Sequence, residues 1–155
     1  MEPILIDQHK PDPHLIDKAA TVLKKRGVII HPTETVYGLA GIYNEFTVLQ
    51  RINEIKLRNL NQPFSIMVNS LEEIFGISGH SKADWLESFL QHFLPGPLTV
   101  LIPRNKAIKP ALWNQFPELG FRYPALLLCR ELLQADPGNA EANQLLEKIK
   151  AAGNT

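Results

Sequence analysis

The chain has 155 residues, 45% of them hydrophobic, and its 16 basic and 16 acidic side chains give a formal net charge of zero. This length fits one domain with a sizeable core, and the balanced charge excludes a global attraction to nucleic acid. Because there is one cysteine and no apolar run of membrane-spanning length, we expect a cytoplasmic protein with no internal disulfide and no membrane contact.

Apolar runs and amphipathic segments alternate along the chain, which predicts secondary structure in chain order. The predicted elements are a strand over residues 4–6, a helix over 15–25, a strand over 28–31, a loop over 32–39, a helix over 46–55, a strand over 64–68, helices over 71–75 and 84–93, strands over 98–102 and 119–123, and helices over 125–135 and 140–152. This alternation predicts an α/β fold with a twisted, mixed, open sheet flanked by helices.

The segment Pro32-Thr33-Glu34-Thr35-Val36-Tyr37-Gly38-Leu39 directly follows a predicted buried strand. Its hydroxyls, carboxylate and phenol therefore cluster past the carboxyl end of that strand, where open α/β sheets bind ligands. Thr33 and Thr35 can hold the polar groups of a small ligand, and Tyr37 can form a wall of the pocket. In the alternative interpretation, the two threonines only cap the backbone of a turn.

Lys56 and Arg58 come at the predicted end of the helix over 46–55, and Gln62 follows closely. Arg58 can bind a phosphate bidentately, and Lys56 can act as a point charge beside it. The alternative interpretation is a solvated helix end, because cations are favoured at the C-terminus of a helix dipole.

Arg122 stands in an otherwise apolar predicted strand, so it needs an anionic partner. An ion pair with Glu34 or Glu118 competes with a substrate carboxylate for this role. Cys129 lies in a leucine-rich run and is predicted to be a buried structural thiol. The histidines show no metal-ligand spacing, so we predict no metal-binding residues.

Three motifs in this order and spacing resemble the YrdC-like family of threonylcarbamoyl-AMP synthases, over about residues 1–124. They are Pro32–Leu39, Lys56-Leu57-Arg58 with Pro63, and Leu94-Pro95-Gly96-Pro97-Leu98-Thr99. The resemblance implies the family's YrdC-like fold. It also implies a nucleotidyltransferase that converts ATP, L-threonine and bicarbonate into threonylcarbamoyl-adenylate and pyrophosphate, for tRNA modification to threonylcarbamoyladenosine. Mg²⁺ would accompany ATP, and a weak contact with tRNA is expected.

Carried over residue by residue, the resemblance assigns each motif a role. Thr35, Tyr37 and Arg122 would bind threonine; Thr33, Lys56, Arg58 and Gln62 would bind ATP; and Lys56 and Arg58 would be the catalytic residues. Met67 departs from the family pattern, since one branch of the family has a histidine there.

A larger departure follows Pro124, where the family runs through a helix into a strand ending in Ser-Thr-Ser-Ala-Asn. Here Asp136-Pro137-Gly138-Asn139 follows the helix and resembles a junction between tetratricopeptide units. We therefore predict an α/β domain over 1–124, closed by an unrelated helical hairpin over 125–155 that could meet a protein partner. The hairpin's predicted packing residues are Leu126, Leu133, Leu145, Leu146 and Ile149.

These features leave three interpretations open. The chain is a threonylcarbamoyl-AMP synthase, active or weakened; or it is a non-catalytic module that binds a nucleotide or RNA; or it is a truncated or chimeric structural scaffold.

Overall fold

The structure is a computed structural model that describes residues 4–59, 61–80, 83–108 and 111–135. Its helices are α1 (Pro13–Lys24), α2 (Phe46–Ile55), α3 (Leu71–Ser78), α4 (Asp84–Phe93) and α5 (Leu127–Ala135), with a 3-10 turn, η1, at Ala111–Gln115. Its strands are β1 (Ile29–His31), β2 (Gly38–Ala40), β3 (Ser65–Met67), β4 (Val100–Pro103) and β5 (Glu118–Arg122). The predicted α/β fold class is confirmed, and α2 and α4 have the predicted bounds.

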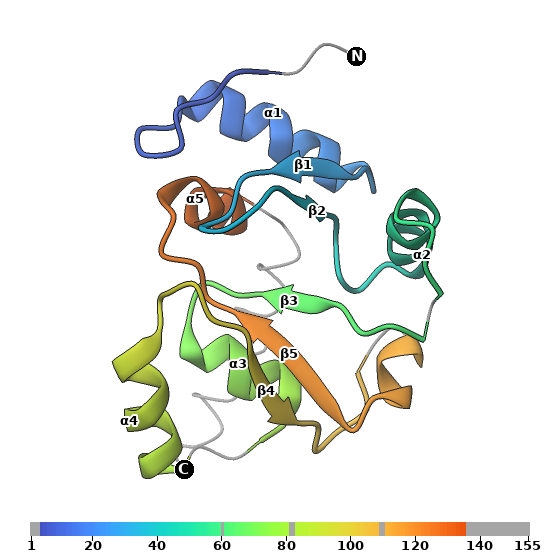
Figure 1. Cartoon of the computed structure of the whole chain (residues 1–155), viewed down its shortest axis with the longest axis vertical. Helices are drawn as coiled ribbons and strands as arrows, with labels where there is room; N and C mark the ends of the chain where they lie inside the picture. Colours follow the sequence, from blue (N-terminus) through green and yellow to red (C-terminus); the bar gives the residue numbers. More distant parts are fainter. Residues whose placement is uncertain (1–3, 60, 81–82, 109–110, 136–155) are drawn as a thin grey trace, which may run out of the picture.

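The described strands form two sheets, one above the other in Figure 1. β1 and β2 make an antiparallel pair, in which Ile30 lies opposite Leu39. In the second sheet β5 is central, parallel to β3 on one side and antiparallel to β4 on the other. The described strands are therefore mixed in direction, as predicted, but they are divided between two small sheets.

Each sheet has its own hydrophobic cluster. The upper cluster joins α1 and α5 to the two-stranded sheet through Ile16, Leu128 and Leu132, with Ile29 packed against them. The lower cluster lies between the three-stranded sheet and α3 and contains Ile66, Ile74, Trp113, Leu119 and Phe121. α5 is therefore part of the packed body of the protein.

Helix ends follow from local sequence. Asp12 caps α1 by accepting a hydrogen bond from the His14 N–H at 2.9 Å, and Pro13 occupies the first turn, where no N–H is needed. Ser70 caps α3 in the same way by accepting from the Glu73 N–H, and α3 ends at Gly79 in the left-handed conformation. None of the helices that the structure describes has the length and apolar character needed to cross a bilayer.

Two predictions in the first forty residues are wrong. Residues 4–6 form no strand; Ile6 packs against the upper cluster, but Leu5 is 96% exposed and the run pairs with no described strand. The segment 32–39 is not a loop throughout, because Gly38 and Leu39 begin β2. The predicted turn at 136–139 and helix at 140–152, with Leu145, Leu146 and Ile149, lie outside the described residues.

Candidate functional site

The turn after β1 is organised around the Thr33 hydroxyl. Thr33 Oγ1 donates to the Val36 carbonyl oxygen at 2.6 Å and accepts from the N–H groups of Thr35 and Val36 at 3.3 and 3.2 Å. These bonds match the capping interpretation for Thr33. They also fix the turn, so that Thr35 and Tyr37 project into solvent as exposed side chains.

Glu34 connects this turn to the junction between β5 and α5. Its Oε1 accepts from the backbone N–H groups of Ala125 and Leu126 at 2.8 and 3.3 Å, at the start of α5. Its Oε2 lies 4.0 Å from Nη2 of Arg122, and the two side chains are only 17% and 22% exposed. Of the two predicted carboxylate partners of Arg122, the structure therefore brings Glu34 to it.

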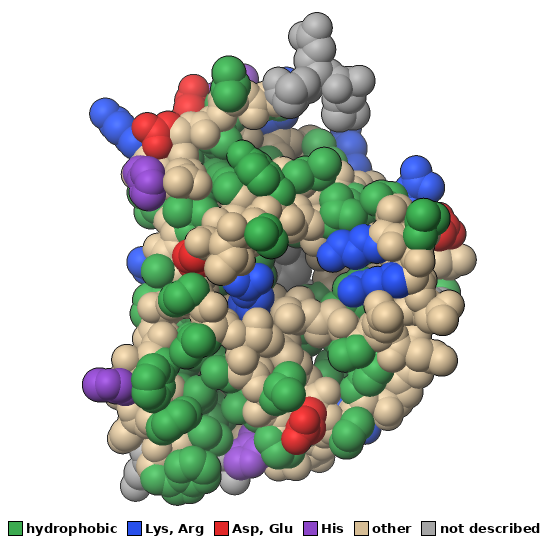
Figure 2. Space-filling model, viewed as in Figure 1, with side chains coloured by type: hydrophobic (Ala, Val, Ile, Leu, Met, Phe, Trp, Pro, Cys, Tyr) green, Lys and Arg blue, Asp and Glu red, His purple; other side chains and the backbone are tan. Residues whose placement is uncertain are grey.

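Arg122 lies on the open side of the three-stranded sheet. Leu119 and Phe121 of β5 are buried in the lower cluster, so the alternating residues Gly120 and Arg122 face the other way. α3 packs on the face that carries Leu119 and Phe121 and lies behind this sheet in Figure 1, so the opposite face of the sheet is turned toward the viewer. Figure 2 shows that this face is hollowed in the middle and carries Lys and Arg side chains on both sides of the hollow.

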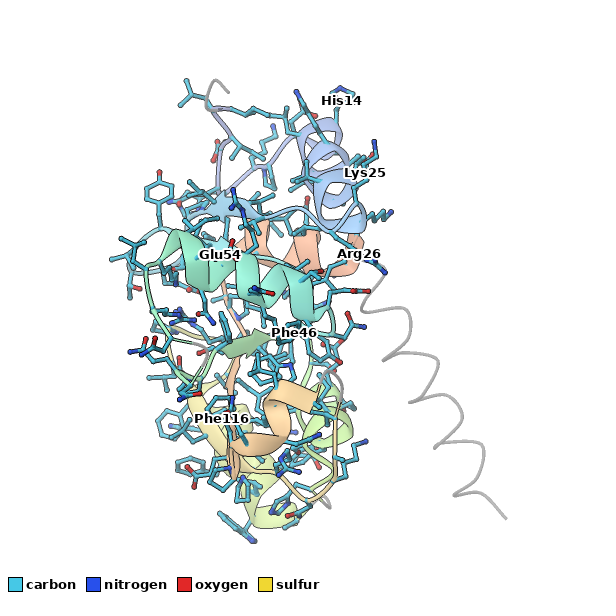
Figure 3. All side chains as sticks on the ribbon, turned by 90° about the vertical axis from the view of Figure 1, so that its right-hand side faces the viewer. His14, Lys25, Arg26, Phe46, Glu54 and Phe116 are labelled. Carbon is cyan, nitrogen blue, oxygen red and sulfur yellow. The ribbon has the colours of Figure 1, made fainter. Side chains whose placement is uncertain are left out.

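Figure 3 shows α2 running from Phe46 toward Glu54, that is, toward the side of the molecule that faces the viewer in Figure 1. The end of α2 therefore reaches the same face. Arg58 Nε donates to Asn53 Oδ1 at 2.6 Å, and the guanidinium lies 4.4 Å above the centre of the Phe64 ring. Partial burial lowers the pKa of Arg58, which nevertheless stays protonated at neutral pH. Lys56 and Gln62 nearby are exposed.

The predicted site residues thus form two groups in the described part of the chain. Thr33, Thr35 and Tyr37 belong to the turn of Glu34, which faces Arg122, whereas Lys56, Arg58 and Gln62 lie just after the end of α2. No described hydrogen bond or ion pair joins the two groups. The structure therefore holds two separate cationic groups, Arg122 in the first and Lys56 with Arg58 in the second.

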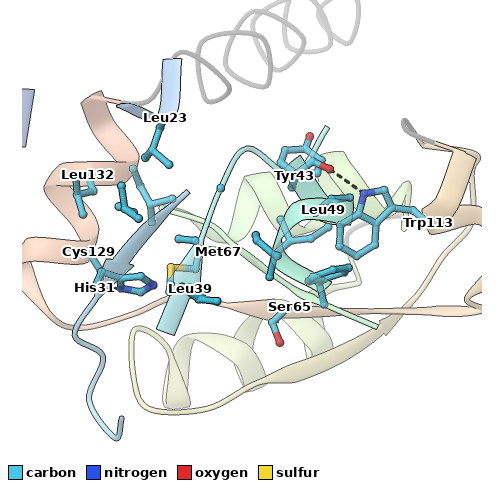
Figure 4. Close-up of a pocket in the computed structure, with 17 residues that line it drawn as sticks. Leu23, His31, Leu39, Tyr43, Leu49, Ser65, Met67, Trp113, Cys129 and Leu132 are labelled. Atoms are coloured by element: carbon cyan, nitrogen blue, oxygen red, sulfur yellow. Dashed lines mark hydrogen bonds between the residues drawn. The ribbon is translucent and has the colours of Figure 1, made fainter. Parts of the chain in front are cut away.

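A cavity of about 130 Å³ lies between the two sheets (Figure 4). Its walls are mostly apolar, with His31 and Cys129 at one end and Tyr43 and Trp113 at the other. None of the predicted site residues, all of which the structure describes, lines this cavity. This cavity could not be predicted from the sequence, because residues from both sheets and from α1, α2 and α5 meet there.

His31 and Cys129 make a buried polar contact at this cavity. His31 Nδ1 lies 2.8 Å from the Pro32 carbonyl oxygen, to which the Cys129 thiol donates at 3.4 Å. Burial lowers the pKa of His31 and raises the pKa of the Cys129 thiol to about 11. The prediction of a buried structural thiol is confirmed, since so basic a thiol is a poor nucleophile.

Comparison with known proteins identifies the family. The family model Sua5_yciO_yrdC, described as "Telomere recombination", matches residues 21–145. The threonylcarbamoyl-AMP synthase of Pyrococcus abyssi is 27% identical over 116 residues, which are 75% of this chain and 34% of that protein. The synthase of Chromobacterium violaceum is 28% identical over 149 residues, which are 91% of this chain and 76% of that protein.

Solved structures have the same fold. The crystal structure of P. abyssi Sua5 complexed with L-threonine has a TM-score of 0.75 and 25% identity, covering 86% of this chain and 39% of that one. The crystal structure of E. coli YciO has a TM-score of 0.71 and 26% identity, covering 84% and 63%. This chain thus spans about a third of the length of P. abyssi synthase and of the Bacillus subtilis synthase, at 34% and 35%.

The family match extends beyond the predicted region of resemblance. It continues past residue 124 to residue 145, through α5, and an unrelated tetratricopeptide-like origin for the segment after 124 is not supported. The motifs, the fold and the matched residues agree, and the chain belongs to the Sua5/YciO/YrdC family.

Proposed function

We propose that this chain is a threonylcarbamoyl-AMP synthase-like protein that binds ATP and L-threonine. One observation carries the proposal: two partly buried guanidinium groups lie in separate parts of the fold, Arg122 beside the turn after β1 and Arg58 at the end of α2. Two separated cationic groups suit two anionic substrates, an amino-acid carboxylate and a polyphosphate. That P. abyssi Sua5 was crystallised with L-threonine supports this assignment.

In this proposal Arg122, with Thr35 and Tyr37, holds the threonine. The threonine amine attacks the bicarbonate carbon, a C–O bond of bicarbonate breaks, and water leaves to give a carbamate. A carbamate oxygen then attacks the α-phosphorus of ATP, and pyrophosphate leaves. Lys56 and Arg58 neutralise the phosphate charge, and Gln62 and the Thr33 end of the turn complete the nucleotide site. The protein contributes position and charge, with no covalent intermediate on a side chain.

The described residues do not fit a resident Mg²⁺ site. They contain no group of three or more His, Cys, Asp or Glu side chains that could hold a metal ion. Glu34, the carboxylate in the predicted site, is already used by two backbone N–H groups and by Arg122. Mg²⁺ usually keeps several waters and binds to substrate phosphates, so we expect it to arrive with ATP.

A non-catalytic nucleotide-binding module is the second candidate. Glu34 already lies beside Arg122, and it would compete with a threonine carboxylate for that guanidinium. Arg58 makes no ion pair in the described part of the chain, so a nucleotide site could persist where the threonine site is weak. With the proposed synthase function we also expect a cytoplasmic location, a weak contact with tRNA and a protein partner.

The test is pyrophosphate release from ATP in the presence of L-threonine and bicarbonate. We expect threonine-dependent release that the double variant Lys56→Ala/Arg58→Ala abolishes. Arg51→Ala is the matched control, because Arg51 is an exposed cation on α2 outside the site. ATP binding without release would select the non-catalytic module, and the absence of both would reject the proposal.

A further inference from the structure

We propose that Asn53 and Phe64 are positioning residues that hold the Arg58 guanidinium in advance for a phosphate group. This inference rests on the proposed function, since it concerns the nucleotide side of the same site. It adds two residues that no motif in the sequence points to, one inside α2 and one just before β3.

The first support comes from how α2 ends. The Leu57 N–H donates to the Glu54 carbonyl and the Arg58 N–H to the Asn53 carbonyl, both at 3.1 Å, which is the bonding pattern of a Schellman motif. Leu57 takes the left-handed position of this motif with φ of 50°. The chain therefore turns sharply after Lys56 and brings Arg58 back beside Asn53.

Asn53 consequently binds Arg58 twice. Its backbone carbonyl accepts from the Arg58 N–H, and its side-chain Oδ1 accepts from Arg58 Nε at 2.6 Å. Asn53 is 3% exposed, so this acceptor is fixed by the surrounding core. Its Nδ2 is buried and has no hydrogen-bond partner among the described residues. Because an unpaired buried donor is costly, we attribute the presence of a polar side chain here to its bond with Arg58.

Phe64 fixes the plane of the same guanidinium. The group lies 4.4 Å above the ring centre, within the range of a cation–π contact. Phe64 in turn packs edge-on against Trp113 at 6.0 Å, and the Trp113 indole N–H donates to the Tyr43 carbonyl at 3.0 Å. The ring below Arg58 is therefore anchored in the core.

Together these contacts occupy Nε and one face of the guanidinium. The two Nη groups have no hydrogen-bond or ion-pair partner in the part of the chain that the structure describes, and they remain available for two oxygens of one phosphate. A guanidinium held in this way loses less freedom on binding, which raises affinity without a new contact.

The test measures binding of inorganic pyrophosphate, ATP and L-threonine by calorimetry. We expect Asn53→Ala and Phe64→Leu to weaken pyrophosphate and ATP binding about tenfold, on the scale of one lost charge-assisted or cation–π contact, with threonine affinity unchanged. Phe64→Tyr keeps the ring face and should bind like the wild type. Arg51→Ala controls for the loss of a cation from α2, and Arg58→Ala sets the maximum loss.

A second readout is independent of any ligand. In the wild type, the Arg58 Nε–H signal should be resolved by NMR and protected from solvent exchange, and Asn53→Ala should abolish that protection. If Asn53→Ala does not fold, the inference is tested by comparing the pyrophosphate and ATP affinities of Phe64→Leu and Phe64→Tyr. Wild-type binding with unchanged affinity in Asn53→Ala and Phe64→Leu would overturn this inference alone. If the wild type binds neither ATP nor pyrophosphate, both this inference and the proposed function are rejected.

Discussion

At the scale of single residues, Glu34 links the turn after β1 to segments far away in the chain. Its carboxylate accepts two backbone N–H groups at the start of α5 and faces Arg122. A carboxylate at a helix N-terminus is also favoured by the helix dipole. Glu34 thus joins the turn, β5 and α5, which explains how an exposed loop keeps a defined position.

Replacing Glu34 should destabilise the protein in a graded way. Glu34→Ala leaves the Ala125 and Leu126 N–H groups without their acceptor, and we expect a loss of about 1–2 kcal/mol in the free energy of unfolding. Glu34→Gln keeps an oxygen acceptor and should lose less. Urea unfolding measures both, with the exposed Glu118→Ala as control. Equal effects of Glu34→Ala and Glu118→Ala would contradict the anchoring role.

The Cys129 thiol should react slowly in the folded protein. With a pKa of about 11, the thiolate fraction at pH 8 is about one in a thousand, against about one in four for an ordinary exposed thiol. Alkylation by iodoacetamide at pH 8 should therefore be more than about a hundredfold slower than in denaturant. Mass spectrometry of the time course measures this ratio, and similar rates in both states would show that the thiol is accessible and activated.

His31 should make stability depend on pH. Burial lowers its folded-state pKa below the unfolded value of 6.5, so the unfolded state binds the proton more readily. The stabilisation is therefore complete above pH 6.5 and is lost as the pH falls through the folded-state pKa. Unfolding free energies of the wild type and His31→Gln should differ in slope below pH 6.5. Glu73, whose pKa burial raises, contributes equally to both proteins, and parallel curves would exclude His31 as the cause.

At the scale of elements, the sequence predicts helices better than strands. α2 and α4 have the predicted bounds because their apolar residues repeat at helical spacing over ten residues each. β2 was missed because three residues, Gly38–Ala40, carry no alternation, and their pairing with β1 is a contact between segments. The 3-10 turn η1 was missed for the same reason, since its buried Trp113 is fixed by Tyr43, far away in the chain.

The end of α2 offers a test of backbone strain. Leu57 has φ of 50°, a conformation that costs a non-glycine residue about 1 kcal/mol, and its side chain is 94% exposed. Leu57→Gly removes this strain and loses almost no packing, so we expect stabilisation of up to about 1 kcal/mol. Gly79→Ala is the opposite case, because Gly79 already has φ of 71° at the end of α3, and should destabilise. Chemical denaturation compares the two, and a loss of stability in Leu57→Gly would contradict the argument.

The candidate site shows the same limit of sequence information. The motifs located the turn after β1 and the cations after α2, but the sequence alone could not choose between the possible partners of Arg122. Asn53 and Phe64 gave no signal, because an asparagine inside a helix and an aromatic residue before a strand are ordinary core residues. Their relation to Arg58 exists only after α2 ends in a left-handed turn.

At the scale of the whole molecule, few polar contacts among the described residues join the two-stranded sheet to the three-stranded sheet. An isolated two-stranded sheet is marginally stable, so β1 and β2 need support from α1, α5 and the lower body. The Trp113 indole N–H supplies one such link by donating to the Tyr43 carbonyl, just after β2. Figure 4 shows this bond at the end of the cavity that separates the sheets.

Trp113→Phe should therefore loosen the upper sheet more than the lower one. The change removes the hydrogen bond from the indole N–H to the Tyr43 carbonyl and creates space beside the cavity, and we expect a loss of about 2 kcal/mol in the free energy of unfolding. Hydrogen exchange should accelerate at Ile30 and Leu39 in the β1–β2 pair more than at Phe121 in β5. Trp85→Phe, at a side chain 71% exposed, is the matched control and should change neither quantity. Equal acceleration in both sheets would mean that they open as one unit, and it would contradict a special role of the Trp113–Tyr43 bond in holding the upper sheet.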